Sequence, residues 1–265
     1  MSNTENKQKV LTALKNKNFV KVISGIKNYD KQRTISIAIS AEACGASALD
    51  ICDDPEIIKA VKSSVELPLF VSSVDPLKLI AAVSLGADVL EIGNYEGFYK
   101  EGKMFTPHEI LDILQFVRKS IPKDILICCT VPSTLEIENQ IKLAKELVNA
   151  GANILQTEGF ASEIPDTERK EQSYLDILKA VSTLANTLEL RKAIPDINII
   201  TASGITPTTA PLAVSVGANG VGVGTCINSL ASQFEMTKMV KELVGSVNRF
   251  VPQFAEYLNP TVARK

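Results

Sequence analysis

Four ionisable residues stand inside or beside apolar stretches of the sequence, where they are candidates for acid–base chemistry. Lys21, Asp50 and Glu91 each interrupt an apolar run, and Glu158 closely follows another. Burial shifts the pKa of such groups, so each can act as a catalytic proton donor or acceptor, and the Lys21 amine can also act as a nucleophile. The alternatives are structural: Lys21 reaching solvent from a strand end, Asp50 and Glu91 only partnering it, and Glu158 as a solvated loop residue.

The spacing of a repeated dipeptide indicates which way these side chains point. Gly-Ala begins at positions 45, 86, 151 and 217, and five residues after each glycine stand Asp50, Glu91, Gln156 and Gly222. Side chains alternate between the two faces of a strand, so these four positions are equivalent. A carboxylate is tolerated better inside a barrel, near its open end, than beneath a packed helix. We therefore expect all four inside a barrel, with Lys21 beside Asp50 on the neighbouring strand.

Apolar runs that alternate with amphipathic segments predict the elements that position these residues. We expect strands near residues 19–24, 48–51, 67–71, 89–92, 125–129, 154–157, 197–202 and 220–223. Strands that alternate with helices form parallel sheets. The Gly-Ala repeat, together with the matching turns Ser24-Gly25-Ile26 and Ser203-Gly204-Ile205, favours a closed (β/α)8 barrel, or TIM barrel. The alternative, an open dinucleotide-binding sheet, has only the incomplete glycine pattern of residues 220–224.

The chain length is consistent with a single barrel domain. It has 265 residues, and a (β/α)8 barrel typically takes about 250. We expect residues 1–18 to form a short N-terminal helical segment, whose Val10, Leu11 and Leu14 close the bottom of the barrel. Residues 19–265 would then form the barrel itself.

Two glycine-bearing turns predict a phosphate site. They follow the seventh and eighth strands, where (β/α)8 barrels hold phosphate, and contain Ser203, Gly204, Ile205, Gly222, Gly224 and Thr225. Glycine lets backbone N–H groups approach an anion, and the start of the next helix adds its positive end; the alternative is that these glycines only make tight turns. We also expect Asn94, Thr130 and Gln156 to line the substrate pocket. The longer connections 93–106 and 158–172 lie on the same face and are candidate lids.

Composition and the remaining motifs exclude several classes of protein. The net charge is −2 with no basic stripe, which excludes a nucleic-acid surface, and no apolar run approaches the roughly 20 residues of a membrane span. The five cysteines fit no metal spacing and resemble reduced core thiols. The single histidine, His108, stands in a helix start with Thr106 as N-cap, Pro107 next and Glu109 closing a capping box. We expect no metal and no cofactor; a Mg²⁺ ion on Asp50, Glu91 and Glu158 is the alternative.

Several motifs together carry a family resemblance that spans nearly the whole chain. They are Val20-Lys21-Val22-Ile23-Ser24-Gly25, Glu91-Ile92-Gly93-Asn94-Tyr95 with Gly97-Phe98-Tyr99, Thr130-Val131-Pro132, Gln156-Thr157-Glu158-Gly159 and Gly220-Val221-Gly222-Val223-Gly224. In this combination the sequence resembles the hypothetical chloroplast reading frame 23 family of algal plastids and cyanobacteria. The resemblance implies a barrel of the aldolase type in a plastid stroma or a cyanobacterial cytoplasm, and it implies no reaction. The phosphate turns are more loosely similar to those of sugar-phosphate epimerases and thiazole synthase, whose catalytic residues have no full match here.

These observations favour an enzyme that acts on a small phosphorylated metabolite. The expected chemistry is isomerisation, epimerisation, or the making or breaking of a carbon–carbon bond, as in a lyase or synthase. The alternative is a non-catalytic, phosphometabolite-binding or regulatory barrel. The expected partner is a small phosphorylated molecule, with no nucleic acid and no membrane, and a homo-oligomer is the candidate assembly.

Overall fold

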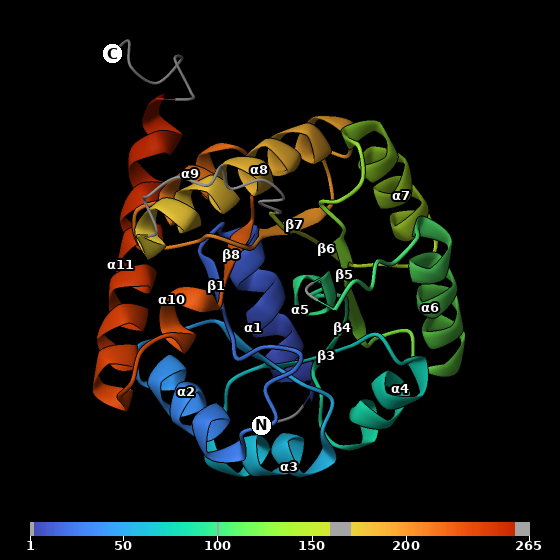
Figure 1. Ribbon diagram of the computed structural model, residues 1–265, viewed down its shortest axis with the longest axis horizontal. Coiled ribbons are helices and arrows are strands. Elements are labelled where there is room, and N and C mark those ends of the chain that lie inside the picture. The colour runs from blue at the N-terminus through green and yellow to red at the C-terminus, as the bar shows by residue number, and fades with distance from the viewer. Residues whose placement is uncertain (1–2, 100, 160–170, 258–265) are drawn as a thin grey trace.

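Eight parallel strands close into a barrel in the computed structural model, which describes residues 3–99, 101–159 and 171–257 (Figure 1). Each strand pairs with the next in the chain, and the last pairs with the first. The strands are β1 (Phe19–Ile23), β2 (Ala48–Ile51), β3 (Leu69–Ser73), β4 (Val89–Ile92), β5 (Leu126–Val131), β6 (Ile154–Thr157), β7 (Asn198–Thr201) and β8 (Gly220–Val223). The closed (β/α)8 barrel is thereby confirmed, and the open sheet is excluded.

A ring of helices surrounds the strands (Figure 1). The helices of the described residues are α1 (Asn3–Lys15), α2 (Lys31–Ala43), α3 (Pro55–Ser64), α4 (Pro76–Ser84), α5 (Glu96–Tyr99), α6 (Pro107–Ser120), α7 (Ile137–Asn149), α8 (Gln172–Ala193), α9 (Ala210–Ser215), α10 (Thr225–Asn228) and α11 (Gln233–Tyr257). The short helices α5 and α10 directly follow strands, in the connections that approach the site. The rest of the candidate lid after β6, residues 160–170, and the end of the expected barrel domain, residues 258–265, lie outside the described residues.

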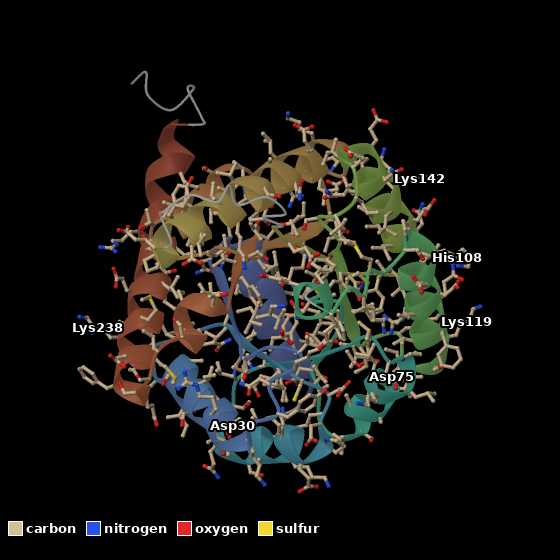
Figure 2. All side chains as sticks on the ribbon, in the orientation of Figure 1. Asp30, Asp75, His108, Lys119, Lys142 and Lys238 are labelled. Atoms are coloured by element: carbon tan, nitrogen blue, oxygen red, sulfur yellow. The ribbon has the colours of Figure 1, made fainter. Side chains whose placement is uncertain are left out.

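Helix starts follow from local sequence signals. The side chains of Asp54, Asp75 and Thr106 cap α3, α4 and α6 by accepting backbone N–H bonds, and proline follows each of them. The predicted capping box of Thr106 and Glu109 is confirmed. His108 therefore lies on the outer surface, where Figure 2 shows it at the edge of the helical ring, and its Nδ1 atom is 2.9 Å from a carboxylate oxygen of Asp112.

The core has two parts, one on each face of the barrel wall. Outward-facing strand residues such as Leu49, Ile51 and Leu90 pack against the helices in the larger cluster. Inward-facing residues of the lower barrel form a second cluster, which consists of Phe19, Ala48, Phe70, Val89, Leu126, Cys128, Ile154 and Ile200 with Val10 and Leu14 of α1. The α1 helix thus closes the bottom of the barrel, as predicted, and Asn6 anchors it by donating to Asp88 at 3.2 Å.

The strand predictions hold to within one residue at each end, except for β3, which is shifted by two residues, and β5, which ends two residues later than expected, at Val131. The strand expected at 67–71 is β3 at Leu69–Ser73. Pro68 has no N–H group to donate to a sheet, which delays the start of the strand. Ser72 and Ser73 continue it and pair with Glu91 and Ile92 of β4. The glycines of the Gly-Ala repeat take left-handed backbone angles, for example φ 75° at Gly45 and 104° at Gly151, and so end their helices as predicted.

Candidate active site

A polar layer lies inside the barrel, directly above the inward-facing apolar cluster of the lower barrel (Phe19, Phe70 and their neighbours), which is called the apolar floor below. Its members occupy the inward positions next above the floor residues, and they are Lys21, Asp50, Ser72, Glu91, Thr130, Gln156 and Gly222. The strand phase inferred from the Gly-Ala repeat therefore places Asp50, Glu91, Gln156 and Gly222 in the interior as expected. The side chains of Lys21, Asp50 and Glu91 are fully buried.

Lys21 forms its ion pair with Glu91 of β4, one of the two acids expected as structural partners, and not with Asp50, which was expected beside it on the adjacent strand. The register explains the difference: Lys21 is level with Ala48, whereas Asp50 is level with Ile23, two residues further up β1. This stagger lets the long lysine side chain extend across the barrel to Glu91. The Lys21 ammonium also lies 4.8 Å from the centroid of the Phe70 ring in the floor.

The charges of this layer shift one another's pKa values. Burial disfavours the ammonium of Lys21, but the carboxylates of Glu91 and Asp50 outweigh it and raise its pKa above the ordinary value. Burial and the negative charge of Glu91 raise the pKa of Asp50 to about 7, against the opposing effects of Lys21 and of hydrogen bonds from Ser72 and Asn94. Near neutral pH the layer therefore holds a charged lysine and a carboxyl group, Asp50, that exchanges a proton readily.

The amide of Gln156 connects the ion pair to the upper barrel. Its Nε2 atom donates to Glu91 Oε1 at 2.7 Å, to Asn94 Oδ1 at 3.0 Å and to Thr130 Oγ1 at 3.2 Å. Asn94 in turn donates to Asp50 Oδ2 at 2.9 Å. The three residues predicted for the substrate pocket thus form one hydrogen-bonded group with both buried acids.

The backbone of the turn after β4 is shaped to bring Asn94 over this layer. Asn94 has φ 65° and Gly93 has φ 140°, both in the left-handed region. A Cβ atom at Gly93 would lie 2.3 Å from Cβ of Thr130, so only glycine fits between the two strands there. The backbone N–H of Asn94 donates to Thr130 Oγ1 at 3.3 Å and fixes the turn.

A pocket of about 610 Å³ opens above the polar layer. All six predicted phosphate residues line it: Ser203, Gly204, Ile205, Gly222, Gly224 and Thr225. Asn94, Gln156 and Glu158 also line it, whereas Lys21, Asp50, Glu91 and Thr130 do not. Asn94 and Gln156 therefore separate the pocket from the ion pair beneath.

The two glycine turns differ in the space around them. A Cβ atom at Gly204 would lie 2.2 Å from the carbonyl oxygen of Asp176, because α8 packs directly on this turn, and φ is 68°. Gly224 precedes α10, its φ is −120°, and a Cβ atom there would make only ordinary contacts, at 3.5 Å or more. Gly204 is therefore needed for packing, whereas Gly224 tolerates a side chain sterically.

Arg33 and Asn228 belong to the pocket although their sequence contexts do not single them out. The Arg33 guanidinium donates to the carbonyl oxygen of Asn228 at 2.9 Å and to that of Leu230, at the end of α10. Asn228 donates to the carbonyl oxygens of Ile23 and Ser24 at 3.0 and 3.1 Å. Arg33 lies in the first turn of α2 in the sequence and resembles a solvated helix residue, so only its tertiary contacts reveal it.

The wall of the pocket also carries acidic side chains, Glu158 and Glu96 among them. Glu158 is buried, accepts hydrogen bonds from the hydroxyl of Tyr99 and from the backbone N–H of Ser133, and burial raises its pKa to about 7 despite those bonds. Glu96 lines the same wall and pairs with Lys179 of α8. The connection 93–106 thus lines the pocket with Asn94, Glu96 and Gly97, and its Tyr99 donates to Glu158.

No group of three or more His, Cys, Asp or Glu side chains is placed to hold a metal ion among residues 3–99, 101–159 and 171–257. No helix within those same ranges has the length and apolar character needed to cross a bilayer. The carboxylate of Glu91, a candidate Mg²⁺ ligand, is already engaged by Lys21 and Gln156.

The fold and the mouth of the barrel define the class of protein: a (β/α)8 barrel of the aldolase type. Similar solved structures include a 3-hexulose-6-phosphate synthase, at TM-score 0.59 and 16% identity over 86% of this chain and 99% of that one. A thiamine phosphate pyrophosphorylase from Pyrococcus furiosus has TM-score 0.59 and 17% identity over 89% and 98%. The aldolase QR15 has TM-score 0.60 and 16% identity over 91% and 97%. At such identities the similarity concerns the fold alone.

Sequence relatives identify the family more narrowly. The family model described as "Protein of unknown function (DUF561)" matches residues 1–251. "Uncharacterized protein ycf23" of Pyropia yezoensis is 36% identical over 238 residues, 90% of this chain and 85% of that protein. The protein of the same description from Cyanophora paradoxa is 31% identical over 243 residues, 91% and 97% of the two chains. The chain belongs to this family, which confirms the resemblance seen in its motifs.

Proposed function

We propose that the protein is an enzyme that acts on a small phosphorylated metabolite. Isomerisation, epimerisation, and the making or breaking of a carbon–carbon bond are the reactions that its groups fit. On a phosphorylated substrate each uses a phosphate anchor for binding, a proton carrier, and a charge that stabilises an anionic intermediate.

One observation carries the proposal. The pocket is lined by the two glycine turns, and its floor is formed by the side-chain amides of Asn94 and Gln156, which bond the buried acids Asp50 and Glu91. The turns at 203–205 and 222–225 and the floor residues Asn94 and Gln156 face one volume of about 610 Å³. Phosphate would bind to backbone N–H groups of the turns, and Arg33, which donates to the carbonyl oxygen of Asn228 at the end of α10, lines the same pocket. The titrating acids Glu158, at the wall, and Asp50, below the floor, supply proton carriers with pKa values near 7.

For Lys21 the surroundings support an electrostatic role. Its pKa is raised by Glu91 and Asp50 beyond what burial takes away, so it is an ammonium at neutral pH and not an attacking amine. A fixed positive charge beneath the floor favours an enolate-like intermediate above it. Glu91 would act with Lys21 as its partner, and Asp50 as the proton carrier of the layer.

A non-catalytic binding barrel is the second candidate, and a specific observation favours it. Lys21, Asp50 and Glu91 do not line the pocket, so a ligand in the pocket as it stands would not touch them. A protein that binds a phosphorylated metabolite for regulation needs only the turns and the floor. Turnover of any ligand found by binding distinguishes this candidate from the enzyme.

The test of the proposed function is binding of phosphate-bearing probes, followed by assay of the ones that bind. A ligand at 100 times its Kd stabilises the native state by about 2.7 kcal/mol, which a thermal shift detects. We expect inorganic phosphate and small phosphate esters to raise the Tm of the wild type, and Gly224→Val to abolish the shift while the protein stays folded. Gly204 is unsuitable for this test, since any side chain there collides with the α8 backbone.

The matched control is Gly245→Val in α11. Gly245 has no atom within 4 Å of its Cβ position and no left-handed φ, so the same substitution is tolerated far from the pocket. It should retain the full phosphate-dependent shift. Shifts of equal size in wild type, Gly224→Val and Gly245→Val would show that phosphate binds elsewhere, and no shift in the wild type would refute the phosphate site.

We also propose that the protein acts in a plastid stroma, or in the cytoplasm of a cyanobacterium. The family membership supports this, through relatives named ycf23 in Pyropia yezoensis and Cyanophora paradoxa. Immunogold labelling of cells of the source organism would check it.

A further inference from the structure

One atom of the pocket floor has no hydrogen-bond partner in the described structure. Oε1 of Gln156 is buried and accepts no hydrogen bond, although the residue lines the pocket and is only 1% exposed. Leaving a buried polar atom unpaired is unfavourable, and such atoms in native proteins usually mark an interaction that forms in another state.

The orientation of this amide is determined by its neighbours. Nε2 faces three acceptors, and the nearest is the carboxylate oxygen Oε1 of Glu91 at 2.7 Å. The other oxygen of Glu91 is engaged by Lys21. A carboxylate accepts hydrogen bonds and cannot donate one when ionised, so it requires the NH₂ group of Gln156 on its side. The Oε1 atom must then point away from the ion pair.

The free oxygen lies on the phosphate side of the pocket. It is 3.1 Å from the Cβ position of Gly222, the residue that begins the second glycine turn. The side chains of Ile23 and Ala202 approach the same position, at 3.0 and 3.1 Å, and both residues line the pocket, so a ligand group that bonds Oε1 approaches it beside these two side chains. Gly224, one of the residues on which we place the phosphate, follows the end of β8 two residues beyond Gly222, or about 7 Å away.

We infer that Gln156 Oε1 accepts a hydrogen bond from a hydroxyl group of the ligand, and that the ligand is a hydroxylated phosphate ester. This inference rests on the proposed function, because it takes the phosphate position from it. Oε1 is an acceptor alone, so it selects a donor. A carbon chain of about three atoms with phosphate at one end and hydroxyl groups on the others spans the distance along β8. Glu91, held by Lys21, is the positioning residue that keeps the acceptor turned to the ligand.

The experiment compares glycerol 3-phosphate with n-propyl phosphate, which has the same carbon chain without the hydroxyl groups, and with inorganic phosphate. Their Kd values are measured by calorimetry. We expect the wild type to bind glycerol 3-phosphate at least about tenfold more tightly than n-propyl phosphate, since a buried acceptor gains its missing partner. In a folded Gln156→Met protein the ratio of the two Kd values should approach one, and this ratio, not either Kd alone, is the readout.

Gln140→Met is the matched control. Gln140 in α7 is also buried, its Oε1 atom also lacks a partner among the described residues, and it does not line the pocket. This variant should discriminate between the two esters as the wild type does. A loss of discrimination confined to Gln156→Met supports the inference.

The outcomes separate this inference from the proposal beneath it. Equal affinity of the wild type for the two esters overturns the inference while the phosphate site stands, and this comparison needs no variant. Discrimination that persists in a folded Gln156→Met protein also overturns it. If none of the three probes binds the wild type, the proposed phosphate site fails and the inference fails with it.

Discussion

Lys21 of β1 and Glu91 of β4 form a fully buried ion pair that crosses the barrel interior, three strands apart. The pair lies between the apolar floor, where Phe70 contacts the ammonium, and the amide of Gln156. Both carboxylate oxygens of Glu91 are occupied, one by Lys21 and one by Gln156. A buried charge pair of this kind is stable only while both members remain.

The first prediction concerns this interdependence. Lys21→Met or Glu91→Gln alone should lower the free energy of unfolding by about 3–5 kcal/mol, because each leaves a buried group without its partner. The double variant should lose clearly less than the sum of the two single losses. Urea unfolding of the four proteins gives the coupling energy, and additive losses would contradict the pairing.

The second prediction follows from the protonation of Lys21. Its raised pKa keeps the amine protonated at neutral pH, and its buried position beneath the pocket keeps it from the probe, so it should not form a Schiff base. Incubation with dihydroxyacetone phosphate and reduction with borohydride should leave Lys21 unmodified in the mass spectrum. Exposed lysines such as Lys119 and Lys142, on the outer surface in Figure 2, report whether trapping worked at all. An adduct on Lys21 would instead support attack by its neutral amine.

The location of the polar layer could be predicted from sequence because it depends only on local periodicity. Two-residue alternation along strands and the Gly-Ala spacing were enough to place Asp50, Glu91 and Gln156 inside. Which of the two acids, Asp50 or Glu91, pairs with Lys21 could not be predicted, since it depends on the stagger between β1 and β2. Neighbouring strands do not guarantee neighbouring side chains in a sheared barrel.

The sequence predicted those pocket residues that lie at or directly after the ends of strands, and not those that helices contribute. Residues of the two glycine turns follow strands directly, and all six line the pocket. Arg33 and Asn228 reach it from helices, through hydrogen bonds to carbonyl oxygens of distant segments. A sequence pattern records no such contact, because any helix position with a charged residue looks equally solvated.

The third prediction separates backbone strain from hydrogen bonding at Asn94. Its φ of 65° suits glycine and asparagine, and its side chain donates to Asp50 and Ser72 at 2.9 Å. Asn94→Gly and Asn94→Ala both remove these bonds, but alanine also resists the left-handed backbone by about 1 kcal/mol. We expect Asn94→Ala to be the less stable of the two by about that amount in chemical unfolding. Equal stability would mean that the turn relaxes without cost.

The fourth prediction concerns the pH dependence of stability and uses Glu158. Its pKa in the folded protein is raised to about 7 from an ordinary value of 4.5, by burial. A carboxyl group with a raised pKa contributes stability at low pH that is lost as the pH rises through the folded value. Glu158→Gln remains neutral and can still accept the bonds from Tyr99 and Ser133. Relative to the wild type, it should therefore gain stability between pH 5 and pH 8, by at least about 1.4 kcal/mol, the free energy of one pKa unit.

The control for this prediction is Glu109, whose pKa is shifted in the opposite direction to that of Glu158. The capping box at Thr106 lowers the pKa of Glu109 in the folded protein. The ionised carboxylate therefore contributes stability that is present at pH values above its ordinary pKa and is lost as the pH falls through its pKa in the folded protein. The free energy of unfolding of Glu109→Gln should accordingly fall, not rise, relative to that of the wild type as the pH increases from 3 to 6. Urea unfolding of the three proteins across pH 3 to 8 measures both effects. If Glu158→Gln tracks the wild type throughout, Glu158 is not held in the buried, Tyr99-bonded position, and its role as a proton carrier at the pocket wall loses its basis.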